Sequence, residues 1–140
     1  MRRILLSIGG TLVVLLVLFV GYVYVVNRPL PPQPSDTVIL EKTLELLSNP
    51  TTWSKECDRS CGDDERTTLY CALKKASVDV TGEFKHRAAS LQEVRYAIEE
   101  LHPDKDYAHR LQDFNNDPDI SLLDVRLVVE AALKALRPEA

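Results

Sequence analysis

The sequence predicts an all-α protein with one N-terminal transmembrane helix followed by a small domain of about five short helices. Two observations carry this prediction. The run Ile4–Val26 contains no charged side chain, and the rest of the chain places its apolar residues at helical spacings of three and four. We therefore expect three parts: residues 1–26 as a cytoplasmic tip and anchor, residues 27–35 as a linker, and residues 36–137 as the helical domain.

The anchor prediction rests on the length and flanks of the apolar run. At 1.5 Å per residue the run reaches about 34 Å, enough to cross a hydrocarbon core of about 30 Å. The alternative is a secretory signal peptide, but no small-residue cleavage site follows the run, so an uncleaved single-pass signal-anchor is favoured. Arg2 and Arg3 flank one end and only Arg28 closely flanks the other. The positive-inside rule then places the N-terminus in the cytoplasm and the domain outside it, at a plasma or bacterial inner membrane.

The net charge of the chain limits the classes of partner that we expect it to bind. The net charge is −4, and it is −6 when Arg2 and Arg3 are set aside with the anchor. An acidic domain has no long-range attraction for nucleic acid, so we expect no nucleic-acid partner. The expected partners are the membrane and another protein. No cofactor is expected, because the phosphate-loop, zinc-protease and serine-hydrolase motifs are absent from the sequence.

The linker and helix boundaries follow from proline and capping residues. Four prolines fall within residues 27–35, which is typical of a stiff, extended spacer. Ser90 with Glu93, and Ser121 with Asp124, have the spacing of capping boxes that open helices. Helices are expected at about 36–48, from 67 or 68 to about 77, at 90–101, from 104, and at 121–136, with residues 78–85 as a loop or brief extended piece.

The three cysteines leave several pairings open. Cys57 and Cys61 are candidates for a disulfide in a polar segment, with reduced thiols as the alternative. A C-x3-C pair without a suitably spaced histidine is a poor zinc signature, so no metal site is assigned. Cys71 lies between apolar residues, where we expect a buried thiol.

Residues 113–124 carry oxygen-bearing side chains at the spacing of a calcium loop, which makes a calcium-binding module one alternative. However, Pro118 occupies the position that needs a sharp glycine turn, and Asp124 replaces the usual glutamate. A turn followed by a helix cap at Ser121 explains the same residues and is favoured.

A small thiol- or carboxylate-dependent hydrolase is the other alternative. Cys71 with one of the three histidines would be the minimum for a thiol nucleophile. The carboxylate run Asp63–Glu65 is more typical of a solvated loop. Trp53 and Phe114 are expected in the core, with Asn115 bonding buried backbone. We therefore assign no catalytic residue.

Several of these segments fall into one pattern, whose residues are Leu44–Leu47, Trp53, Cys71, Ala72, Phe114, Asn115, Pro118, Ser121, Asp124 and Ala131–Ala132. Over about residues 38–136 the chain resembles an uncharacterised domain family of bacteria and their phages. Its members have a leucine-rich helix, a Trp, an aromatic-Cys-Ala segment, an aromatic-Asn-Asp turn with Pro, and a capped final helix. Lys74 and Asn116 depart from that pattern. The resemblance implies no activity. The leading expectation is a membrane-tethered protein-interaction module outside the cytoplasm.

Overall fold

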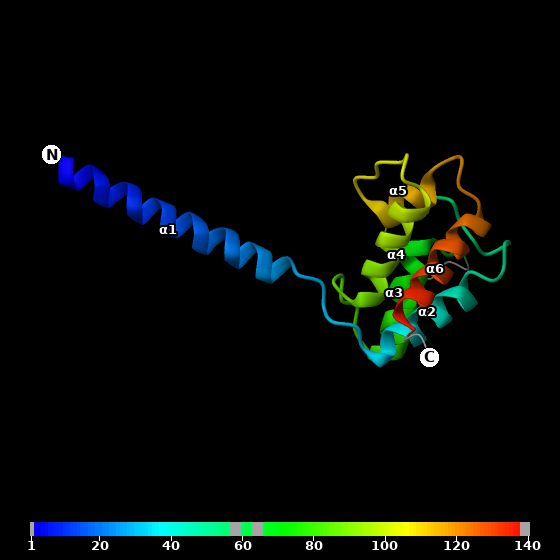
Figure 1. The fold of residues 1–140 in the computed structure, drawn as a ribbon. Helices are drawn as coiled ribbons and strands as arrows, with labels where there is room; N and C mark the ends of the chain where they lie inside the picture. The colour runs from blue at the N-terminus through cyan, green and yellow to red at the C-terminus, as the bar shows by residue number, and fades with distance from the viewer. Residues whose placement is uncertain (1, 57–59, 63–65, 138–140) are drawn as a thin grey trace.

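The computed structural model describes residues 2–56, 60–62 and 66–137, with the side chains of the first helix described from 13 to 26. These residues form six helices and no strand, which confirms the predicted all-helical class. The helices are α1 (Arg2–Asn27), α2 (Pro34–Leu46), α3 (Leu69–Thr81), α4 (Ala89–Leu101), α5 (Arg110–Asn116) and α6 (Leu122–Leu136) (Figure 1).

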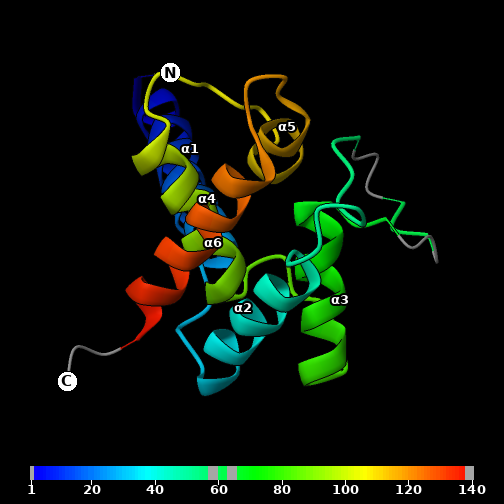
Figure 2. The same ribbon diagram turned by 90° about the vertical axis from the view of Figure 1, so that its right-hand side faces the viewer.

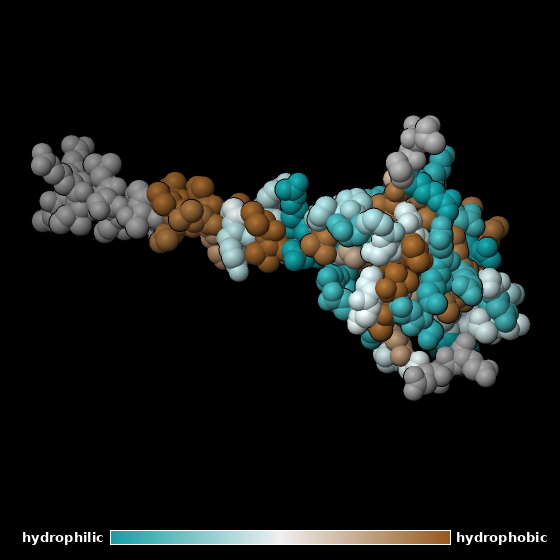
Figure 3. Space-filling model, turned by 90° about the horizontal axis from the view of Figure 1, so that it is seen from below, coloured by the Kyte–Doolittle hydropathy of each residue, from teal (hydrophilic) through white to brown (hydrophobic). Residues whose placement is uncertain are grey.

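Helix α1 extends away from a body made of α2 to α6 (Figure 1). Its described side chains, from Val13 to Val26, are almost all apolar and are exposed. In Figure 3 this part of α1 is mostly hydrophobic in colour, whereas the body mixes hydrophobic and hydrophilic patches. The chain between α1 and α2 is tied to the body, because Leu30 N donates to Arg87 O at 2.9 Å.

The prediction of a transmembrane anchor is wrong for the part of the chain that the structure describes. None of the described helices is both long enough and apolar enough to cross a membrane. The same finding contradicts three further predictions: a single-pass signal-anchor, a membrane partner, and a membrane location with the domain outside the cytoplasm.

The core of the body lies where α2, α4 and α6 meet, with α3 against α2 and α5 against both α3 and α4 (Figure 2). Each helix contributes one apolar stripe, as its spacing predicts. The largest fully buried apolar side chains are Leu40, Leu47, Leu69, Leu73, Leu91, Val94, Ile98, Phe114, Val125, Val128 and Val129.

Asp36 fixes the starts of two helices at once. Helix α2 begins at Pro34, whose ring suits the first helical turn. The buried Asp36 carboxylate accepts hydrogen bonds from Gln33 N at 2.7 Å and from Ser90 N at 2.9 Å. The predicted cap at Ser90 is therefore wrong: Ala88 precedes α4, and a carboxylate from α2 takes up the helix amide instead. The Ser90 hydroxyl is buried with no hydrogen-bond partner among the described residues.

Two other helix ends follow local chemistry. Ser121 and Asp124 form the predicted capping box, with Ser121 N donating to Asp124 Oδ2 at 2.8 Å. Helix α3 runs through Val78, which was predicted as loop, and ends at Gly82 with φ +79°. A glycine in this left-handed conformation is a common way to end a helix, and it accounts for the position of the helix end.

The disulfide differs from the predicted pairing. Cys61 is bonded to Cys71, with their Cα atoms 5.3 Å apart, so Cys61 is not paired with Cys57. Cys57 lies outside the described residues. Cys61 adopts a left-handed φ of +46°, which turns the loop before α3 so that its side chain reaches the first turn of that helix. The sequence pattern around Cys71 shows an apolar helix face but does not reveal this partner.

Candidate functional site

The loop before α3 is held in place by Asn115, which is fully buried in α5. Its Oδ1 accepts hydrogen bonds from Trp53 Nε1 at 3.1 Å and Leu69 N at 3.0 Å. Its Nδ2 donates to Ser54 O at 3.1 Å and Lys55 O at 3.0 Å. The expectation that Asn115 bonds buried backbone is confirmed, although the backbone belongs to other segments rather than to its own turn.

A large hollow lies beside the Cys61–Cys71 bond, between the end of α2 and α3. It has a volume of about 690 Å³, within the range of ligand and peptide pockets. We call it the disulfide groove; its lining residues are Glu45, Leu46, Ser48, Asn49, Thr52, Cys61, Gly62, Arg66, Thr67, Cys71, Lys74, Lys75, Val78 and Asp79. A second hollow, of about 580 Å³, lies against the same loop and shares Cys61, Gly62, Arg66 and Cys71 with it.

The charges in the disulfide groove differ from those of the whole chain. Its lining has three cations, Arg66, Lys74 and Lys75, and two carboxylates. One of those carboxylates, Asp79, is paired with Lys42 at 3.6 Å. The groove therefore carries a positive balance on a chain whose net charge is −4. Between the charges, Val78 presents an apolar side chain that is 43% exposed.

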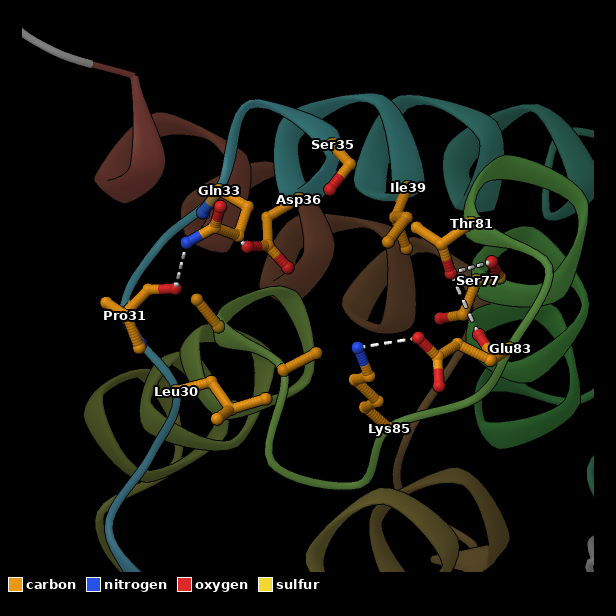
Figure 4. Close-up of a pocket in the computed structure, with 12 residues that line it drawn as sticks. Leu30, Pro31, Gln33, Ser35, Asp36, Ile39, Ser77, Thr81, Glu83 and Lys85 are labelled. Carbon is orange, nitrogen blue, oxygen red and sulfur yellow. Dashed lines mark hydrogen bonds and ion pairs between the residues drawn. The ribbon is translucent and has the colours of Figure 1, made fainter.

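A smaller hollow of about 100 Å³ lies between the segment before α2 and the loop after α3 (Figure 4). Its polar groups already bond one another. Lys85 is paired with Glu83 at 2.6 Å, and the Thr81 hydroxyl lies 2.8 Å from Ser77 O and 2.9 Å from Glu83 O. Asp36 is engaged as the shared helix cap. This hollow is therefore part of the folded framework rather than a ligand site.

The carboxylates of the candidate calcium loop bind different groups of the fold. Asp113 accepts from His109 N at the start of α5, and Asp124 caps α6. Asp117 accepts from Tyr107 Oη at 2.7 Å and from Lys105 Nζ at 3.0 Å, and Lys105 also contacts Asp119 at 3.0 Å. An ammonium thus lies where a cation would sit. No three acidic, histidine or cysteine side chains gather as a metal site within the described residues.

The pKa values of this cluster follow from the same contacts. The hydrogen bond from Tyr107, with those from Asp119 N and Lys105, lowers the pKa of Asp117 to about 2. Hydrogen bonds to Asp119 and Asp117 raise the pKa of Lys105. Burial and the bond to Asp117 raise the pKa of Tyr107. All three shifts favour the ion cluster that closes the turn before α6.

The residues considered for a thiol- or carboxylate-dependent hydrolase have structural contacts or lie outside the described residues. Cys71 Sγ is bonded to Cys61, so it is not a thiolate nucleophile in this structure. His102 packs on Phe114, with ring centroids 5.0 Å apart. Asp63, Asp64 and Glu65 lie outside the described residues.

The other residues of the sequence pattern serve the fold. Trp53 Nε1 donates to the buried Asn115 amide, Phe114 is fully buried in the core, and Pro118 O accepts from Lys55 Nζ at 2.7 Å. The disulfide groove was missed because it depends on the Cys61–Cys71 pairing, which no spacing rule specifies. The signal available in the sequence was Lys74, Lys75 and Val78 on one helix.

No protein-family model, curated protein or solved structure matches the chain. The resemblance to the uncharacterised bacterial and phage domain family therefore stays a prediction.

Proposed function

We propose that this chain is a protein-interaction module that binds a segment of a partner protein in the disulfide groove. The observation that supports the proposal most is the size of the groove together with the charged and apolar residues that line it. A hollow of about 690 Å³ between two helices can admit several side chains of a peptide segment. The Cys61–Cys71 bond fixes two of its lining residues relative to each other, which reduces the ordering cost on binding.

The lining specifies the chemistry of the partner segment. Val78 and the half-buried Leu46 offer an apolar floor, where one apolar side chain of the partner gains contact area. Arg66, Lys74 and Lys75 surround it with positive charge, which favours carboxylates next to that apolar side chain. The partner segment is therefore apolar at its centre and acidic at its flanks.

A photo-crosslinking side chain placed in the full chain tests this proposal in the cells that make the protein. Position 78 lies in the groove, and position 38 is the matched control, because Val38 is 47% and Val78 43% exposed and Val38 lies outside the groove. We expect one discrete protein adduct from position 78 that is absent from position 38. The adduct should disappear when Lys74→Glu and Lys75→Glu are added.

Two results would overturn the proposal. One is an equal set of adducts from both positions, which indicates nonspecific contact. The other is the absence of any adduct from position 78 while the chain is folded and present at its normal level.

A further inference from the structure

A further hollow lies between α3, α4 and the start of α5, away from the disulfide groove and sharing no residue with it. It has a volume of about 180 Å³ and is lined in part by Tyr70, His86, Arg95, His109 and Arg110. We call these five residues the cationic cleft. They come from three helices and two loops, so the fold brings together groups that are far apart in the sequence.

Arg95 is the central group of the cleft. It is half-buried, and its Nη1 donates to His86 O at 3.0 Å. Burial, followed by the charge of Arg110, lowers the pKa of Arg95. Three other described arginines are paired with carboxylates: Arg110 with Glu99, Arg126 with Glu130 and Arg137 with Glu41. No ion pair of the described chain involves Arg95.

The acidic groups near the cleft are already engaged. Glu99 is paired with Arg110 at the rim. Asp113 Oδ2 accepts from His109 N at 2.7 Å, where it begins α5. The half-buried guanidinium of Arg95 thus lies beside a second guanidinium, with no carboxylate of its own. A bound anion would relieve that repulsion and supply the missing charge-assisted hydrogen bonds.

An aromatic wall adjoins these cations. Tyr70 packs edge-on against Phe84, with ring centroids 5.7 Å apart, and Phe84 packs against His86 at 4.6 Å. Such a wall accepts the flat or apolar body of a ligand. The small volume restricts that ligand to one anionic group on a compact body.

We propose that the cationic cleft binds a small organic oxyanion, with its anionic group on the Arg95 guanidinium and its body against Tyr70. The anionic group is a carboxylate or a phosphate, since a planar guanidinium forms paired hydrogen bonds with both. This site is independent of the proposed partner-binding groove.

Titration calorimetry of the full chain at constant ionic strength tests the proposal with three probes: benzoate, phenyl phosphate and inorganic phosphate. We expect saturable binding of benzoate or phenyl phosphate, with the stronger of the two identifying the anionic group. Inorganic phosphate should bind more weakly, because it lacks a body to contact Tyr70. Binding of inorganic phosphate as strongly as phenyl phosphate would overturn the role of the aromatic wall.

Matched variants locate the site. Arg95→Gln should weaken the best probe by about tenfold or more, since a charge-assisted pair is lost. Arg126→Gln, at another partly exposed arginine, should leave affinity unchanged. Arg110→Gln, at a solvent-facing position, is a second test if Arg95→Gln unfolds the protein. No binding of any probe, or equal weakening by Arg126→Gln, would overturn the proposal.

Discussion

Asn115 shows how one amide can set the position of three segments. It satisfies Trp53 Nε1, the first amide of α3 and two carbonyl groups of the loop before it. Replacing it leaves several buried polar groups without partners, and each such group costs free energy. The residue type was expected from the sequence, because a buried Asn must find partners, but the identity of those partners depends on contacts 46 and more residues away.

Asn115→Ala should lower the free energy of unfolding by about 2–4 kcal/mol, since buried donors and acceptors lose their partner. Chemical denaturation monitored by Trp53 fluorescence measures this. Glu100→Ala, at an exposed position of α4, is the control and should change stability by less than about 0.5 kcal/mol. Equal effects of the two substitutions would show that the Asn115 contacts contribute little.

The lowered pKa of Asp117 predicts that the protein loses stability in acid. The folded pKa of this residue, about 2, lies below the ordinary aspartate value of 3.8, so its contribution to stability is fully present above pH about 4. That contribution is lost as the pH falls from there through about 2, because the unfolded chain takes up a proton first. Melting temperatures measured from pH 6 to pH 2 should fall more steeply for the wild type than for Asp117→Asn. Parallel curves would contradict this assignment.

At the scale of elements, the helices followed local signals and the loop before α3 did not. Apolar spacing predicted five helices in the body, and Ser121 with Asp124 predicted the start of α6. The helix expected from 104 begins only at Arg110, where the Asp113 carboxylate accepts from His109 N. The start of α4 was missed because Asp36, from another helix, caps it. The disulfide was missed for the same reason: Cys61 and Cys71 meet only once the loop has turned.

The Cys61–Cys71 bond closes a loop whose two ends are 10 residues apart in the sequence. Closing a loop of this size stabilises the fold by about 2–3 kcal/mol through the unfolded state. The double variant Cys61→Ser, Cys71→Ser should therefore unfold at lower denaturant, and a reducing agent should lower the stability of wild type but not of the double variant. Cys57→Ser keeps both bonded cysteines and is the control. A double variant as stable as the wild type would contradict the tether.

At the scale of the whole molecule, α1 projects from the helical body (Figure 1). The described part of that body carries two separate candidate binding sites. The disulfide groove lies against α2 and α3, and the cationic cleft lies against α3, α4 and α5. Composition predicted an acidic chain without affinity for nucleic acid, but net charge hides both local positive sites. They form only when residues from several helices come together, which is why spacing along the chain did not reveal them.

The central proposal is that the disulfide groove binds a partner segment. The most direct test measures how tightly the chain binds the partner protein that the crosslinker at position 78 captures. Calorimetry with the full chain should show at least about tenfold weaker binding for Val78→Asp, because an apolar contact is lost and a like charge meets the acidic segment. Val38→Asp, at an equally exposed position outside the groove, should bind like the wild type. Unchanged affinity for Val78→Asp, or equal loss for both variants, would contradict the claim.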